Sequence, residues 1–183
     1  MSRLYAERNG LLRRWMGAEG ERLRWMALDV RTRESARREV KDAARPHFAD
    51  LAEFRSDPRR LWMELDAIER MIEARDRCLV VRVGAEVVYR AFVLSDPARV
   101  ERVVAPRGVR APAWVVSGVM THPAFRGRGI HGAAMDWLAA EARRAGVRYV
   151  VVWVAAWNRS SRRAFERAGF QLLERAEDPR AGG

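Results

Sequence analysis

The chain of 183 residues has few of the features that mark several protein classes. It contains one cysteine, Cys78, so an intramolecular disulfide framework is excluded and a cysteine-based metal site is not expected. The longest apolar run, Tyr149 to Trp157, is shorter than the roughly 18 residues that a membrane-spanning helix needs, and the N-terminus lacks an apolar segment of signal-peptide length. We therefore expect a cytoplasmic protein with no membrane partner and no bound metal.

Apolar side chains are plentiful by contrast. They make up 49% of the chain and include seven Trp and six Phe, which is enough for a proper hydrophobic core. The length favours one domain with an N-terminal elaboration. We expect residues 1–76 to form a mainly helical portion packed on the same core, residues 77–176 to form the main fold, and residues 177–183 to be a flexible tail.

Charge is distributed unevenly around a net value of +11. Residues 1–76 are nearly balanced, with 17 basic and 15 acidic side chains, whereas residues 77–183 carry 18 basic and 9 acidic side chains. An anionic ligand of the C-terminal part is one interpretation, and a solvated basic surface is the other. The basic side chains fall into two groups along the chain, Arg99, Arg102, Arg107, Arg110, Arg126 and Arg128, and then Arg159, Arg162, Arg163 and Arg167.

Helical patterns dominate the first 76 residues. Pro58 stands where a first helical turn would begin, and four apolar residues at helical spacing follow it between Leu61 and Ile72, which predicts a core-facing amphipathic helix. Thr32 to Ala44 is charged and helix-prone. Leu23 to Val30 is compatible with either a helix or an opening strand.

From Cys78 onward the pattern changes to strands alternating with helices. The expected order is a hairpin from two strands, a loop rich in Pro and Arg, a strand, a helix, a buried strand, a short helix capped by Asn158, and a last strand. Because strands alternate with helices here, we expect an α/β (α+β) fold whose mixed sheet has at least one parallel pair. The corresponding ranges are 78–83, 86–94, 95–112, 114–121, 129–146, 149–156, 158–168 and 170–173.

The segment from Arg126 to Gly132 carries the clearest chemical signal. Its small residues let backbone N–H groups approach an anion, and the following helix N-terminus adds partial positive charge, so the segment is typical of a phosphate cradle. Gly127, Gly129 and Gly132 also satisfy the dinucleotide-binding pattern. We reject that interpretation because five residues separate the pattern from the preceding strand, no acidic residue ends the next strand, and too few residues follow.

Two blocks in this region resemble those of the GNAT superfamily of acyl-CoA-dependent N-acetyltransferases. The signature R-x-x-G-x-G/A falls on Arg126, Gly129 and His131. The second block, N-x-x-A/S-x-x-x-Y-x-x-x-G-F, falls on Asn158, Ser161, Phe165 and 169–170. The resemblance covers roughly residues 78–173.

The resemblance implies a mixed sheet with a central V-shaped CoA site. It implies that backbone groups around Val119 and Thr121 hold the pantetheine and thioester, that the glycine-rich segment holds the pyrophosphate, and that Asn158 and the following helix hold the pantetheine side. The acyl-CoA-binding residues implied in this way are Val119, Met120, Thr121, Arg126, Gly127, Arg128, Gly129, Ile130, His131, Gly132, Asn158, Ser161 and Phe165.

Three departures from the family pattern concern the chemistry. His131 replaces the usual Gly or Ala, and would either crowd the pyrophosphate or donate a hydrogen bond to it. Trp153 and Val115 stand where some relatives carry a catalytic Glu, and Phe165 replaces the Tyr that protonates the leaving thiolate. The catalytic residues are therefore unknown, with Glu86 and Tyr89 on a neighbouring strand as weak candidates.

We accordingly predict a GNAT-like N-acetyltransferase that uses acetyl-CoA or another acyl-CoA as co-substrate and a small-molecule or peptide amine as acceptor. Two alternatives stay open. In one, which we do not favour, the basic half contacts a nucleic acid and the acceptor is an aminoacyl-tRNA. In the other, the chain is a non-catalytic acyl-CoA-binding module. A homodimer is compatible with either, and the acceptor cannot be read from the sequence.

Overall fold

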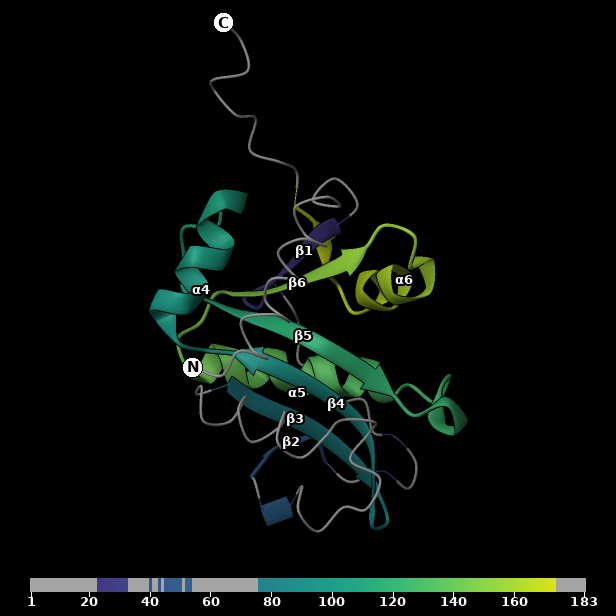
Figure 1. Ribbon diagram of the computed structural model, residues 1–183. Helices are drawn as coiled ribbons and strands as arrows, with labels where there is room; N and C mark the ends of the chain where they lie inside the picture. Colours follow the sequence, from purple (N-terminus) through teal and green to yellow (C-terminus); the bar gives the residue numbers. More distant parts are fainter. Residues whose placement is uncertain are drawn as a thin grey trace, which may run out of the picture.

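A computed structural model describes residues 23–32, 40, 43, 45–50, 52–53 and 76–173 (Figure 1). In these ranges strands and helices follow one another in an α+β arrangement. The elements are β1 (Leu23–Asp29), β2 (His47–Ala49), β3 (Asp76–Val83), β4 (Glu86–Leu94), α4 (Pro97–Val104), the 3-10 turn η3 (Ala105–Arg107), β5 (Ala113–Thr121), the 3-10 turn η4 (Pro123–Phe125), α5 (Ile130–Arg144), β6 (Tyr149–Ala155), α6 (Arg159–Arg167) and β7 (Gln171–Leu172).

The described strands form one mixed sheet in the order β2-β3-β4-β5-β6-β1-β7. β3 and β4 form the predicted hairpin, and β4 pairs antiparallel with β5. β5 and β6 are parallel neighbours joined through α5, as the strand-helix-strand pattern predicts. The mixed fold expected from the sequence is therefore confirmed.

Strand β1 settles the ambiguity of residues 23–30, of which Leu23–Asp29 form a strand and not a helix. It lies between β6 and β7, where Met26 pairs with Val152 on one side and Leu172 on the other. A segment from the N-terminal side of the chain thus completes the sheet beside its C-terminal strand. The helix predicted between Leu61 and Ile72 and most of that predicted over 32–44 lie outside the described residues, so the helical N-terminal portion stays a prediction.

The expectation of a loop over residues 95–112 is wrong for its first half, because residues 97–104 form helix α4. The Asp96 carboxylate caps this helix by accepting a hydrogen bond from the Arg99 backbone N–H at 2.9 Å. Pro97 occupies the first turn, where its missing N–H costs nothing. Val100 and Val104, four residues apart, are the buried face of the helix.

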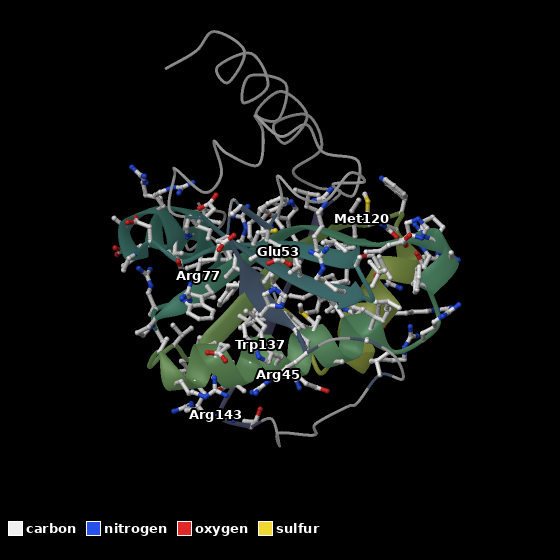
Figure 2. The ribbon with its side chains drawn as sticks, turned by 90° about the horizontal axis from the view of Figure 1, so that it is seen from below. Arg45, Glu53, Arg77, Met120, Trp137 and Arg143 are labelled. Atoms are coloured by element: carbon white, nitrogen blue, oxygen red, sulfur yellow. The ribbon has the colours of Figure 1, made fainter. Side chains whose placement is uncertain are left out.

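Helices cover both faces of the sheet and create two core clusters. On one face, Ala134, Leu138 and Ala142 of α5 pack in one cluster with residues of six strands. On the other face, Val100 and Val104 of α4 pack with β5 and β6. β6 is apolar along its whole length because both of its faces are covered. In Figure 2, Trp137 lies on α5 and Met120 of β5 lies on the opposite side of the sheet.

Candidate acyl-CoA site

β5 and β6 separate at one end of the sheet. Their parallel register runs from Ala113 opposite Tyr149 to Val116 opposite Val152 and then stops, although both strands continue. The separation coincides with an irregularity in β5, where Gly118 has φ of +55° and the register with β4 shifts. Such a bulge bends its strand, and here it leaves the edge of β5 beyond Val116 without pairing to β6.

A groove of about 650 Å³ lies at this opening, between the end of β5, the N-terminus of α5 and one face of α6. The residues predicted to bind acyl-CoA come together here, and all of them except Arg128 line the groove. The lining residues shared with the prediction are Val119, Met120, Thr121, Arg126, Gly127, Gly129, Ile130, His131, Gly132, Asn158, Ser161 and Phe165.

The N-terminus of α5 forms one end of the groove. Gly129, its N-cap, has φ of +80°, a left-handed conformation that glycine adopts without strain, and no side chain caps the helix. The first intrahelical hydrogen bond runs from the Ala133 N–H to the Gly129 carbonyl. The N–H groups of residues 130–132 therefore lack intrahelical acceptors, and together with the helix dipole they suit a phosphate.

The two arginines of the glycine-rich segment behave differently. Arg126 lines the groove, and its Nε donates a hydrogen bond to the Thr121 carbonyl at 3.3 Å, which ties the cradle to the end of β5. Arg128 is outside the lining, and its guanidinium lies 4.9 Å from the centre of the Phe125 ring.

Helix α6 forms the opposite wall. The Asn158 side-chain oxygen caps it by accepting a hydrogen bond from the Ser161 backbone N–H at 3.1 Å, as the sequence predicts. Phe165, one turn further, is 2% exposed and packs edge-on against His131, with 4.7 Å between ring centres. The position of the family's tyrosine is therefore filled by a buried ring that has no titratable group.

His131 contacts the interior as well as the groove. Its Nδ1 lies 3.1 Å from the hydroxyl of Tyr89, a residue of β4 that is fully buried. Burial raises the pKa of Tyr89 well above its ordinary value, so the phenol stays protonated. A protonated phenol can donate to Nδ1, which accounts for the histidine at a position where the family has Gly or Ala.

The candidate catalytic positions give no acid or base in the groove. Glu86 lies at the start of β4, and neither it nor Tyr89 is among the lining residues. Trp153 packs against Trp25, with ring centres 5.4 Å apart, and belongs with Val115 to the cluster on the α4 face. The described lining contains no carboxylate and no tyrosine.

Sequence reasoning missed part of the lining. The additional residues on α6 lie at spacings that bring them onto the face that already carries Ser161 and Phe165, a signal that was available in the sequence. Among the arginines that the structure describes, Arg126 and Arg167 alone line the groove, so the basic groups predicted along residues 99–167 do not gather at this site. The lining residues not predicted are Phe125, Ser160, Ala164, Arg167 and Ala168.

The remaining features of the described chain concern a metal site, a membrane-spanning helix and further reactive side chains. No group of three or more His, Cys, Asp or Glu side chains suited to a metal occurs in it. None of its helices is long and apolar enough to cross a bilayer. His122 caps η4 by accepting from the Ala124 N–H at 3.3 Å, and Cys78 is fully buried, which raises the pKa of its thiol to about 12.

Comparison with known proteins gives one family. A family model described as "Acetyltransferase (GNAT) family" matches residues 42–170. A GCN5-related N-acetyltransferase from Sphaerobacter thermophilus aligns with a TM-score of 0.58 at 15% identity, over 82% of this chain and 48% of that chain. AAC(6')-Iy, solved with a CoA-containing bisubstrate analogue, aligns with a TM-score of 0.54 at 17% identity, over 73% of this chain and 93% of that chain.

A third solved structure is the glucosamine N-acetyltransferase region of a fungal multi-domain GH3 β-N-acetylglucosaminidase. Its TM-score is 0.59 at 14% identity, over 90% of this chain and 22% of that chain. The chain spans about half the length of the Sphaerobacter protein and of several other solved chains that it matches. No curated protein matches the chain significantly. At these identities the likeness concerns the fold.

Proposed function

Because the chain belongs to the acetyltransferase (GNAT) family, we propose that it moves an acetyl or other acyl group from acyl-CoA to an amine. The observation that carries this proposal is the groove beside the end of β5, where β6 no longer pairs with it. The groove ends at the uncapped N-terminus of α5. An extended thioester with a pyrophosphate at one end needs such a combination of a strand edge and an anion cradle.

Each part of the groove has a role in this proposal. The backbone N–H groups of Gly127 to Gly132, with Arg126 and Arg167, bind the pyrophosphate. The edge of β5 from Val119 to Thr121 aligns the pantetheine, and Asn158 borders it from α6. Acyl-CoA supplies the activated acyl carbon.

The chemistry is attack by a neutral amine on that carbon. A carbon–nitrogen bond forms, the carbon–sulfur bond breaks, and the proton lost by nitrogen balances the one taken up by sulfur. Correct positioning of the two reactants can lower the barrier by about 7 to 11 kcal/mol, whereas dedicated acids and bases add about 10² to 10⁴ in rate. We therefore propose an enzyme without a carboxylate base in the groove, and we expect Glu86→Gln to lower kcat/KM less than tenfold, which is under about 1.4 kcal/mol.

Two glycines of α5 provide a matched test of the cradle. Gly129 and Gly146 flank the helix, both have positive φ, and a Cβ at either would meet no atom within 4 Å. Only Gly129 lines the groove. Gly129→Val and Gly146→Val should therefore carry similar backbone strain, but only Gly129→Val should abolish acetyl-CoA binding in calorimetry. Circular dichroism verifies that both variants fold. If they do not, Gly129→Ala and Gly146→Ala take their place in the same comparison.

Acyl transfer itself is tested with a panel of amines and acetyl-CoA, following release of the free thiol. Thiol release that depends on an amine supports the enzyme. Tight acetyl-CoA binding without release for any amine would favour the acyl-CoA-binding module, and wild-type affinity in Gly129→Val would show that the site is misplaced.

A further inference from the structure

The bulge in β5 is held by a buried arginine. Arg90 of β4 is 6% exposed, and its Nη1 donates a hydrogen bond of 2.7 Å to the carbonyl of Gly118. Its guanidinium also lies 5.2 Å from the centre of the Phe92 ring. A charged donor on a backbone carbonyl makes a stronger hydrogen bond than a neutral one, so this contact fixes the orientation of the Gly118–Val119 peptide.

The bulge is closely packed against the same two side chains. A Cβ at Gly118 would lie 2.8 Å from Cδ2 of Phe92 and 3.2 Å from Nη1 of Arg90. Gly118 is therefore required both by its φ of +55° and by the contact with β4.

The geometry also gives the direction of the next N–H group. Arg90 is the direct cross-strand partner of Met120, so the two side chains share one face of the sheet. That face is opposite α5, as the position of Met120 shows (Figure 2). The Gly118 carbonyl, which accepts from Arg90, therefore points toward β4 and not toward the groove. Since the carbonyl and N–H of a trans peptide point in opposite directions, the Val119 N–H points away from Arg90 and toward the side of β5 that β6 leaves unpaired, where the groove opens.

The side chain of Val119 lies on the face of the sheet opposite to Arg90. It packs against the core cluster on the α5 face, and Val119 lines the groove beside the N-terminus of α5. The side chains of Val119 and Arg90 therefore lie on opposite faces of the sheet.

We propose that Arg90 is a positioning residue, which aims the Val119 N–H at the acyl carbonyl and strengthens it as a donor through the shared peptide. This inference rests on the proposed acyl-transfer function. The Gly118 carbonyl and the Val119 N–H belong to one peptide group, and hydrogen bonds that share an amide polarise one another. The cationic guanidinium bound to the Gly118 oxygen therefore makes the Val119 N–H a better donor. A donor preset at the carbonyl oxygen, where negative charge develops during attack, stabilises the transition state more than the ground state.

The test uses a non-reactive acetyl-CoA analogue in which a methylene group replaces the sulfur and the carbonyl carbon is ¹³C. Infrared difference spectroscopy of the bound analogue reports how strongly the carbonyl is polarised. We expect Arg90→Gln to move the ¹³C=O band to higher wavenumber, and Arg90→Lys, which keeps the charge, to restore part of the shift. The rate constant kcat should fall about tenfold in Arg90→Gln, less than the roughly 10² to 10³ lost when such a donor is itself removed.

A second arginine provides the control for lost stability. Arg99 donates a charge-assisted hydrogen bond of 2.8 Å to Asp76 on the α4 side of the molecule, and it does not line the groove. Arg99→Gln should lower stability but leave the carbonyl band in place. If Arg90→Gln does not fold, Gly118→Ala, which disturbs the same contacts, should give the same direction of band shift.

The outcomes separate the two proposals. An analogue that binds wild-type protein and keeps the same band in Arg90→Gln, Arg90→Lys and Gly118→Ala would overturn the role of Arg90 and leave acyl transfer standing. Failure of the wild-type protein to bind the analogue would overturn both. A band shift in Arg99→Gln as large as that in Arg90→Gln would also overturn the positioning role.

Discussion

The hydroxyl of Tyr89 lies 3.1 Å from Nδ1 of His131, which joins the middle of the sheet to the first turn of α5. Tyr89 is fully buried and His131 lines the groove, so the contact links the core to the candidate site. Phe165 closes the same cluster, with its ring edge-on to the imidazole. The departure from the family's Gly or Ala at position 131 of α5 is therefore matched by a partner on strand β4.

The first prediction concerns this hydrogen bond. Tyr89→Phe should lower the free energy of unfolding by about 0.5 to 1.5 kcal/mol, because a buried hydrogen bond is lost while the ring is retained. The value of kcat/KM should change less than tenfold, since Tyr89 does not line the groove. Urea denaturation provides the measurement, and Tyr149→Phe, which alters a half-buried phenol outside the groove, is the control. A larger loss of kcat/KM in Tyr89→Phe would place the phenol in the chemistry.

The second prediction concerns the missing proton donor. Phe165→Tyr adds a hydroxyl to a ring that lines the groove, and we expect it to raise kcat by up to about 10²-fold, because it restores an acid near the leaving sulfur. Phe170→Tyr is the matched control, since Phe170 packs on Phe165 at 5.0 Å but lies outside the lining. It should lower stability without raising kcat. Steady-state kinetics decides, and equal rates in both variants would show that the thiolate needs no donor.

The third prediction addresses the positive charge. Of the described basic side chains, Arg126 and Arg167 alone are arginines that line the groove, so acetyl-CoA affinity should fall less than about tenfold between 50 and 200 mM salt, whereas six or more phosphate contacts would cost about 10³ to 10⁵. Arg126→Gln should flatten this dependence, and Arg110→Gln, at an exposed position outside the lining, should not. Calorimetry at several salt concentrations measures both. Sub-micromolar binding of tRNA near 150 mM salt would instead support the nucleic-acid alternative.

The fourth prediction concerns acid stability at the end of β1. Hydrogen bonds from Arg31, opposed by partial burial, lower the pKa of Asp29 to about 2, and Arg148 adds a further contact at 3.2 Å. A carboxylate with a lowered pKa stabilises the fold above its ordinary pKa and loses that contribution as the pH falls toward 2. Asp29→Asn should therefore cost up to about 1 kcal/mol at pH 7, the usual range for partly exposed ion pairs.

The difference between wild type and Asp29→Asn should shrink as the pH falls from about 4 to 2, measured by urea denaturation at each pH. Asp96→Asn is the control, because Asn caps a helix about as well as Asp. A difference that stays constant down to pH 2 would contradict the assignment of the ion pair.

Several elements were predictable because their causes are local. Asn158 and Gly129 delimit helices through capping and backbone conformation, and the alternation of strands and helices after Cys78 requires a parallel pair. Helix α4 also has local causes, because Asp96 and Pro97 start it and Val100 and Val104 form its buried face. The sequence therefore contained the signal for this helix, and the prediction of a loop was wrong.

The amino-acid sequence by itself determined the glycine-rich turn before α5 and the helix that follows it, because glycine conformations, helix caps and apolar spacing act within a few residues. The predicted lining residues came from the resemblance to the family. Tertiary structure alone decided that β1 lies between β6 and β7, that Tyr89 faces His131, and that Arg90 grips the bulge at Gly118. These relationships join residues between 28 and more than 100 positions apart. They depend on which strands become neighbours and on which face each side chain is buried, and neither is specified by a local pattern.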